Sequence, residues 1–249
     1  NKVTVDNLAL ALATSKRVII TGSSRVGKTQ SIKDLTYALA EHSKQTMKCL
    51  PHIKQVFSWN SASLVTPKIG DGISSLQKIK EALGRHGSST LKVFDEFGKT
   101  CTDEKNNHLV VQLLTDLEDK FDNVIAIATE DEYKLLCRMH PSLKNRFCQF
   151  KIESLKSDDT EKVLHHTLLQ EAPQTIVDEG IMLYLVTEYQ NRFRERYPDS
   201  PLPPQPHTSK EMLRRCIARV SKSQKLPETV KLERLRGQLD ALWPKAAVE

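Results

Sequence analysis

Apolar residues along the chain follow two spacings that alternate. Short apolar runs rich in β-branched residues, typical of buried strands, occur at residues 17–21, 55–60, 90–96, 124–129 and 148–152. Apolar residues three or four positions apart, typical of helices, occur at 1–16, 31–42, 73–83, 109–117 and 132–139. Because strands and helices alternate, the sequence predicts an α/β fold with a parallel sheet of five strands.

The pattern changes after residue 155, where only helical spacing remains. It predicts helices at 158–170, 176–197, 208–220 and 230–242, with a loop of five prolines over 198–207. Residues 208–211, Thr-Ser-Lys-Glu, have the form of a capping box and predict a helix start. We therefore expect an α/β domain over residues 1–153 and a small all-helical domain over residues 154–249.

A phosphate-loop motif follows the first predicted strand. Residues 22–29 read Gly-Ser-Ser-Arg-Val-Gly-Lys-Thr and fit the pattern G-x-x-x-x-G-K-[ST] at every position. The glycines let the backbone curl so that N–H groups face a phosphate, at the start of a helix whose dipole favours negative charge. A glycine-rich turn is the alternative, but the flanking strand and helix favour a nucleotide site. The predicted nucleotide-binding residues are Gly22, Ser23, Ser24, Arg25, Val26, Gly27, Lys28 and Thr29.

Two residues of this motif have side chains suited to Mg-ATP. We expect Lys28 to reach the β- and γ-phosphates, and the hydroxyl of Thr29 to help hold Mg²⁺. ATP and Mg²⁺ are therefore the predicted cofactors of the α/β domain.

The predicted strand at 90–96 ends in two acids, Asp95 and Glu96. The carboxyl end of a strand near the phosphate loop is where such a protein needs a carboxylate. We expect Asp95 to hold Mg²⁺, largely through water, and Glu96 to activate the water that attacks the γ-phosphate. An ordinary pair of acids at a strand end is the alternative interpretation.

Thr129 ends the predicted strand at 124–129. If this strand lies beside the one that ends in Asp95 and Glu96, the Thr129 hydroxyl is placed to touch the γ-phosphate or the attacking water. Threonine is also simply a good residue to end a strand. Both interpretations stand at this point.

Composition limits the class of protein and the compartment. Of 249 residues, 39% are hydrophobic and 27% charged, and no apolar run approaches the length that crosses a bilayer, so we expect a soluble protein without a membrane partner. Five cysteines, without C-x-x-C spacing, fit a reducing compartment such as cytoplasm, nucleus or organelle matrix. The net charge of +6 and the pI near 9.0 permit a polyanionic partner, although a solvated basic surface explains them as well.

With these motifs in place, the chain resembles an AAA+ ATPase over nearly its whole length, a P-loop α/β core followed by a small helical lid. Thr129 resembles the polar first sensor of that family, and Arg146, in the run Leu-Lys-Asn-Arg-Phe before the last strand, resembles its arginine finger. The resemblance implies a ring or filament of like subunits that hydrolyses Mg-ATP at subunit interfaces to remodel a macromolecule. It also implies a second sensor arginine in the lid, for which Arg214 and Arg215 are the candidates.

The subfamily remains divided between two groups. Residues 129–160 resemble the first ATPase module of Clp-type unfoldases, and 63–72 resemble their pore loop, although Ile69 or Gly70 stands where an aromatic grips the polypeptide. The Ser-Arg variant of the phosphate loop, residues 209–213 and the basic charge instead resemble DNA-associated AAA+ proteins: transposition regulators, origin-recognition or helicase-loading subunits. We expect a protein-remodelling ATPase, with a DNA-associated ATPase or an ATP-gated assembly scaffold with little turnover as alternatives.

Overall fold

The computed structural model describes residues 2–41, 43–60, 84, 87–102, 111, 115, 122–172, 176–177, 180–198, 205–223 and 229–230. The chain divides into two compact units, Asn1–Ser23 with Gly27–Ile152, and Ser24–Val26 with Glu153–Glu249. Among the described residues, no helix is long and apolar enough to cross a membrane.

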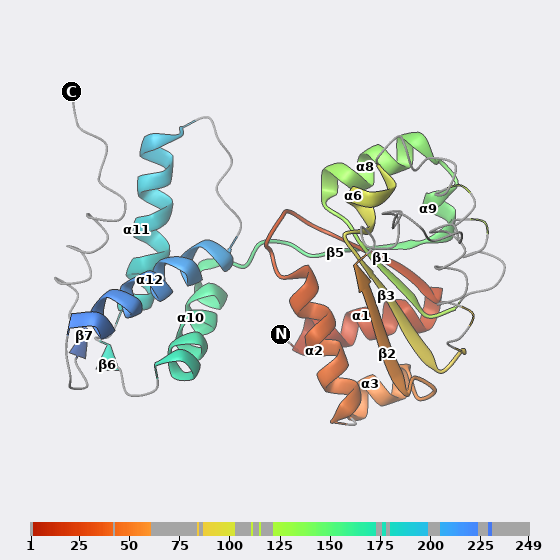
Figure 1. The fold of residues 1–249 in the computed structure, drawn as a ribbon, viewed down its shortest axis with the longest axis horizontal. Helices are drawn as coiled ribbons and strands as arrows, with labels where there is room; N and C mark the ends of the chain where they lie inside the picture. Colours follow the sequence, from red (N-terminus) through yellow and green to blue (C-terminus); the bar gives the residue numbers. More distant parts are fainter. Residues whose placement is uncertain are drawn as a thin grey trace, which may run out of the picture. The chain divides into compact units, whose positions relative to one another are not determined.

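A parallel sheet of five strands, in the order β2-β3-β4-β1-β5, forms the centre of the first unit (Figure 1). Its strands are β1 (Arg17–Thr21), β2 (Gln55–Asn60), β3 (Thr90–Asp95), β4 (Val124–Ile127) and β5 (Cys148–Lys151). The predicted five-stranded parallel sheet is confirmed, with three strands ending one or two residues earlier than expected. In the central position, β1 pairs with β4 on one side and with β5 on the other.

Helices cover both faces of this sheet, with α1, α2 and α3 packed together and α6 packed against α8. Their bounds are α1 (Lys2–Ser15), α2 (Lys28–Ala40), α3 (Lys44–Cys49), α6 (Phe97–Cys101), α8 (Glu130–Met139) and α9 (Leu143–Arg146). Figure 1 shows α6, α8 and α9 on one side of the strands and α1, α2 and α3 on the other. Neither α3 nor α6 was predicted, because both are short and lack a full apolar stripe. The helices predicted at 73–83 and 109–117 fall outside the described residues, except that Val111 and Thr115 are helical.

One core of the first unit lies between the sheet and the α6–α8–α9 face. It joins alternate strand residues to apolar residues of these helices: Ile19, Phe94, Phe97, Cys101, Val124, Ala126, Ala128, Leu136, Leu143 and Phe147. Aromatic rings run through it from the edge strand inward, because Trp59 stacks on Phe94 at 5.5 Å and Phe94 contacts Phe97 at 6.2 Å between ring centroids. This packing fixes the ends of β3 and β4, where the polar residues of the candidate site begin.

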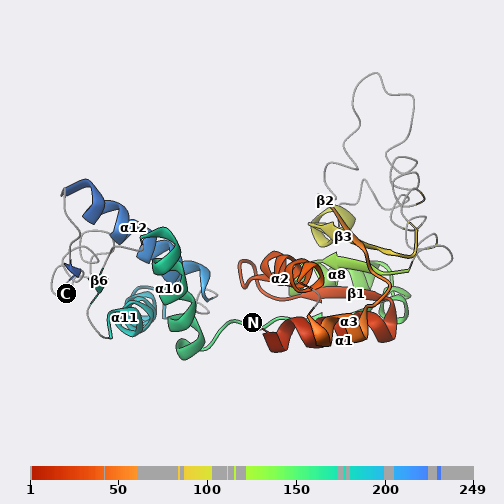
Figure 2. The same ribbon diagram turned by 90° about the horizontal axis from the view of Figure 1, so that it is seen from below.

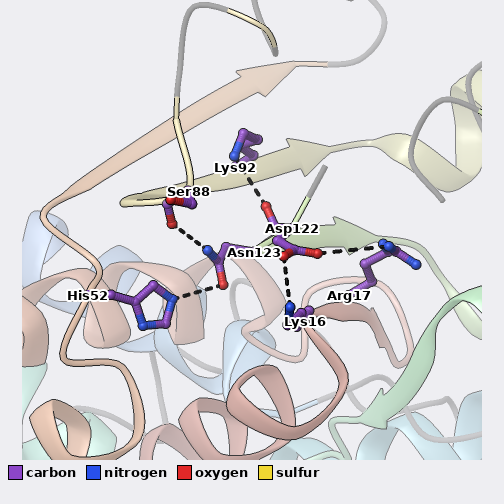
Figure 3. Close-up of polar contacts among 7 residues, drawn as sticks. All are labelled: Lys16, Arg17, His52, Ser88, Lys92, Asp122 and Asn123. Atoms are coloured by element: carbon purple, nitrogen blue, oxygen red, sulfur yellow. Dashed lines mark hydrogen bonds and ion pairs between the residues drawn. The ribbon is translucent and has the colours of Figure 1, made fainter. Parts of the chain in front are cut away.

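A polar cluster joins the amino ends of the strands, at the edge opposite the phosphate loop (Figure 3). Lys92 is 2% exposed, and its Nζ donates to the carbonyl oxygens of Gly87, Thr90 and Asp122 at 3.2–3.3 Å. The Asp122 carboxylate also lies 2.9 Å from Lys16 Nζ. Asn123 donates to the Ser88 carbonyl at 2.6 Å. These bonds satisfy buried polar groups and tie the loops that precede β1, β3 and β4 to one another.

The described part of the second unit is built on three helices, α10 (Ser157–Glu171), α11 (Ile181–Arg196) and α12 (His207–Ser223), which are labelled in Figure 2. Their shared core consists of Leu164, Leu168, Ile181, Met182, Leu185, Val186, Met212 and Leu213. A parallel pair of two-residue strands, β6 (Ile176–Val177) and β7 (Thr229–Val230), accompanies them.

Three sequence predictions for this unit are corrected by the structure. The helix expected from residue 176 begins at Ile181, after Gly180 in the left-handed conformation at φ 79°, because Ile176 and Val177 pair with β7 instead. Val230, expected to open a helix, is itself in β7, and residues 231–242 lie outside the described ones. The helix expected to start with a Thr208 cap begins one residue earlier, and Lys210 N–H already donates to the Pro206 carbonyl.

Candidate nucleotide-binding site

The phosphate loop lies between β1 and α2, as the motif predicts. Gly27 precedes the helix at φ 103°, a left-handed conformation that favours glycine, and the next residue, Lys28, is the first of α2. Because Gly27 has no side chain that could cap the helix, the first N–H groups of a 13-residue helix face the loop. This arrangement is suited to binding an anion.

Lys28 points its ammonium group back into the loop. Its Nζ donates to the carbonyl oxygens of Gly22 at 2.9 Å and Ser23 at 2.8 Å. Burial lowers the pKa of Lys28 from its ordinary value of 10.5, while the carboxylates of Glu132, Asp95 and Glu130 act in the opposite direction. A partly desolvated cation held over the loop is suited to a phosphate group, which would replace the two carbonyls as its partner.

The hydroxyl of Thr29 lies next to the carboxylate that ends β3. Thr29 Oγ1 donates to Asp95 Oδ2 at 3.4 Å, and the other Asp95 oxygen accepts the Glu96 N–H at 2.9 Å. Magnesium takes hard oxygen ligands and usually needs only one or two carboxylates, the rest being water and substrate phosphate. The pair therefore fits Mg²⁺, although no group of three His, Cys, Asp or Glu suited to a metal occurs in the described part of the chain.

Glu96 stands at the turn between β3 and α6 with φ 55°, a left-handed conformation that is costly for a residue with a side chain. Its Oε2 accepts a hydrogen bond from Asn60 Nδ2 at 3.0 Å. Asn60 is the last residue of β2 and lies in register with Asp95. The strained backbone and the amide together hold the carboxylate at the carboxyl edge of the sheet.

Asn60 was missed by sequence reasoning. The available signal was a polar residue closing a predicted strand, the same signal that singled out Asp95 and Thr129. An uncharged amide at a strand end does not by itself indicate a site, and the sequence pattern does not show that β2 lies beside β3.

Thr129 follows β4 at the same edge and caps α8. Its hydroxyl accepts the Glu132 N–H at 3.2 Å, while the Glu132 carboxylate accepts the Thr129 N–H at 2.7 Å, which makes a complete capping box. Gly98 of α6 fits against this box so closely that an added Cβ would lie 2.5 Å from Glu132 Oε2. Since an accepting hydroxyl keeps its own hydrogen, Thr129 can still donate to another group.

Arg146 lies apart from the other predicted catalytic residues. It ends α9 and precedes β5, so it lies where β5 begins, whereas Asp95, Glu96 and Thr129 lie where their strands end. In a parallel sheet these positions are opposite edges. The structure therefore brings together Lys28, Thr29, Asp95, Glu96 and Thr129 and leaves Arg146 on the other side of the sheet.

The two second-sensor candidates each have a carboxylate partner within the helical unit. Arg214 of α12 meets Glu171 of α10, with Nη2 and Oε1 2.6 Å apart, and this hydrogen bond lowers the pKa of Glu171. Arg215 Nε donates to Glu211 at 3.1 Å. A second-sensor role for either arginine stays a prediction from the resemblance.

A comparison with models of known protein families finds no match, and neither does a comparison with curated proteins. Among solved structures, the chain is similar to Hsp104 with ATPγS and casein in a closed state, with a TM-score of 0.75 and 14% identity over 100% of this chain and 43% of that one. Against an ADP complex of S. cerevisiae Hsp104 the TM-score is 0.77, with 15% identity over 97% of this chain and 41% of the other. A Thermotoga maritima RuvB variant has a TM-score of 0.63 and 12% identity over 97% of this chain and 69% of that chain.

These likenesses define the class of fold. The chain has the α/β fold of the AAA+ P-loop ATPases, with its phosphate loop between the central strand and the helix that follows. It spans less than half the length of the Hsp104 chains that it matches.

Proposed function

We propose that this chain is an ATP hydrolase that uses Mg²⁺ and works between subunits of an oligomer. The observation that carries the proposal is the meeting of three elements at one edge of the sheet. Lys28 and Thr29 come from α2, Asp95 and Glu96 from the end of β3, and Thr29 and Asp95 lie within 3.4 Å of each other. A phosphate loop, a metal-binding pair and a base at one edge are the parts that phosphoryl transfer to water needs.

Each residue has a distinct role in this proposal. The N–H groups of residues 22–29 and the Lys28 ammonium bind the β- and γ-phosphates, while Thr29 and Asp95 would hold Mg²⁺. The metal, when bound, neutralises charge on the phosphate oxygens. Glu96 accepts the proton of the attacking water, and Thr129 donates a hydrogen bond to the γ-phosphate or that water. Asn60 positions the Glu96 carboxylate from the neighbouring strand.

Arg146 is assigned to the site of a neighbouring copy. It ends α9 and precedes β5, at the amino edge of its own sheet, whereas the site of its own chain lies at the carboxyl edge. A neighbouring copy whose carboxyl edge meets this amino edge would bring its own site to Arg146. An arginine supplied in trans stabilises the charge of the transferring phosphoryl group. Hydrolysis would then depend on assembly of like or homologous subunits.

The proposed work of this cycle is the remodelling of a protein partner. Support comes from the similarity to Hsp104, whose structures were solved with casein and with ATPγS or ADP. A DNA-associated ATPase is the second candidate, favoured by the net charge of +6 and the pI near 9.0. Residues 63–72, which resemble a pore loop but have Ile69 and Gly70 where an aromatic residue is expected, also bear on the choice between these candidates. They lie outside the described residues.

Phosphate release with Mg-ATP tests the proposal directly. Wild-type protein should hydrolyse ATP, Lys28→Ala should lose ATP binding, and Glu96→Gln should bind ATP but turn over about 10²-fold more slowly. Unchanged ATP affinity in Lys28→Ala, measured by calorimetry, would refute the site. Stimulation by casein or by duplex DNA then separates the two partner classes, and binding without turnover in the wild type would leave the ATP-gated scaffold.

A further inference from the structure

We infer that the side chain of Arg25 is a phosphate-binding group of the nucleotide site, in addition to the backbone of the loop in which it stands. The inference rests on the proposed function, since it assigns a second cation to the same bound nucleotide. Three observations carry it: the backbone conformation of Arg25, its lack of a partner, and the charge around Lys28.

Arg25 occupies a backbone conformation that suits glycine better. Its φ is 65°, in the left-handed region where a Cβ approaches the following carbonyl oxygen and costs free energy. Four non-glycine residues have positive φ among those described: Lys16, Arg25, Glu96 and Asn123. Two of them, Arg25 and Glu96, belong to the proposed site. Strain of this kind collects at functional sites.

The guanidinium of Arg25 has no partner among the residues that the structure describes. Arg25 is exposed, and no hydrogen bond or ion pair joins it to any of them. Lys28, three residues later, instead donates to two loop carbonyls. An unpaired guanidinium at the phosphate loop presents five N–H donors in a planar fork, and this fork matches two oxygens of a phosphate.

Negatively charged side chains surround Lys28, and a bound nucleotide adds more negative charge. The carboxylates of Asp95, Glu130 and Glu132 act electrostatically on Lys28, and Glu96 adjoins Asp95. A nucleoside triphosphate brings several more negative charges to this acidic edge of the sheet. Lys28 and one Mg²⁺ balance only part of them, and Arg25 is the other cation within the loop.

The test compares Arg25 variants that differ in charge or in backbone freedom. Arg25→Lys keeps the positive charge, while Arg25→Asn removes it in a residue that also tolerates left-handed φ. Arg25→Gly removes the side chain and relieves the backbone. Lys33→Asn, on the exposed face of α2, is the matched control because it removes one positive charge outside the loop. The measured quantity is the dissociation constant of Mg-ATP, by calorimetry at low and at high salt.

We expect Arg25→Asn and Arg25→Gly to bind Mg-ATP about 10-fold more weakly or worse, as for a lost hydrogen bond to a charged group. Arg25→Lys keeps the charge but loses the planar fork, so its affinity should fall between those of the wild type and these two variants. Lys33→Asn should be unchanged, and the loss should shrink as salt rises. If Arg25→Gly binds as tightly as the wild type, Arg25 serves no phosphate and the inference is wrong. Lys28→Ala is measured alongside to distinguish failure of this inference from failure of the proposed function. Wild-type affinity in Lys28→Ala would refute the whole nucleotide site, and not only the role of Arg25.

Discussion

The side-chain amide of Asn60 holds the carboxylate of Glu96, the proposed general base. Asn60 Nδ2 donates to Glu96 Oε2 at 3.0 Å, and Glu96 itself stands in a left-handed backbone conformation with φ 55°. A general base must lie within hydrogen-bond reach of the proton that it accepts. Asn60 is therefore a positioning residue in the proposed reaction.

Removal of the amide should slow hydrolysis without weakening ATP binding. Asn60→Ala is expected to lower kcat between about 10-fold and 100-fold, the range of a misplaced catalytic group, because Glu96 loses its partner. Ser58→Ala, two residues earlier on the same side of β2, is the control and should leave kcat unchanged. An Asn60→Ala enzyme with wild-type kcat would show that the hydrogen bond does not serve the reaction.

We expect His140 to make the stability of the first unit depend on pH. The residue is 6% exposed, its Nε2 has no hydrogen-bond partner among the described residues, and burial lowers its pKa from the ordinary value of 6.5. Below pH 6.5, His140 therefore binds a proton in the unfolded chain. In the folded chain His140 stays neutral until the pH reaches its lower, folded-state pKa. The free energy of unfolding must then fall as the pH falls through that window.

Urea unfolding of wild type and His140→Asn, at about pH 7.5 and about pH 5.5, measures how much His140 contributes to the pH dependence of the free energy of unfolding. The wild type should lose more stability than the variant on acidification, by at most about 1.4 kcal/mol per pH unit. Equal losses in the two proteins would mean that the burial of His140 does not alter its protonation.

At the scale of elements, the start of α8 combines two tasks in Thr129. The capping box with Glu132 satisfies N–H groups at the helix end, and Gly98 of α6 packs directly against it. The same hydroxyl lies at the end of β4, beside the strand that carries Asp95. A stable helix start and the proposed contact with the γ-phosphate thus depend on one side chain.

Two variants separate these tasks. Thr129→Ala and Glu132→Ala each remove half of the capping box and should each cost about 1 kcal/mol in the free energy of unfolding. Only Thr129→Ala removes the hydroxyl, so it alone should lower kcat at saturating ATP. Equal kcat values for the two variants would leave Thr129 as a helix cap only.

For the whole molecule, the proposed requirement for a second copy follows from the opposite edges of the sheet. Lys28, Thr29, Asp95 and Glu96 lie at the carboxyl edge, while Arg146 ends α9 and precedes β5 at the amino edge. A head-to-tail contact brings the two edges of different copies together, and such contacts form rings when the rotation closes or filaments when it does not. The turnover per subunit should therefore rise with protein concentration.

Mixing two inactive variants tests this arrangement. Arg146→Ala should bind ATP normally and hydrolyse it about 10³-fold more slowly, whereas Lys144→Ala, which removes a neighbouring exposed cation of α9, should stay active. Adding Lys28→Ala, which cannot load ATP but still offers Arg146, should restore part of the activity. No recovery, together with a rate per subunit that is flat on dilution, would place Arg146 outside the reaction.

The sequence by itself determined those features that depend on contiguous residues. The phosphate loop of residues 22–29 and the alternation of β-branched runs with helical spacing are local patterns, so the five strands and the existence of α2 followed from them, although α2 begins at Lys28 and not at residue 31. The position of Asp95 at the end of β3, close to Thr29, was also foreseen, because parallel strands bring their carboxyl ends to one edge.

Only the tertiary structure decided features that depend on a distant partner. Asn60 meets Glu96 because β2 lies beside β3, and Ile176 and Val177 form a strand because Thr229 and Val230 pair with them. The left-handed backbones of Arg25 and Glu96 leave no trace in an apolar pattern, since each is held by the turn around it. The spacing of apolar residues indicates which face of a helix or strand is buried. Tertiary packing decides which other element that face contacts, and which residue the side chain at the end of a strand meets.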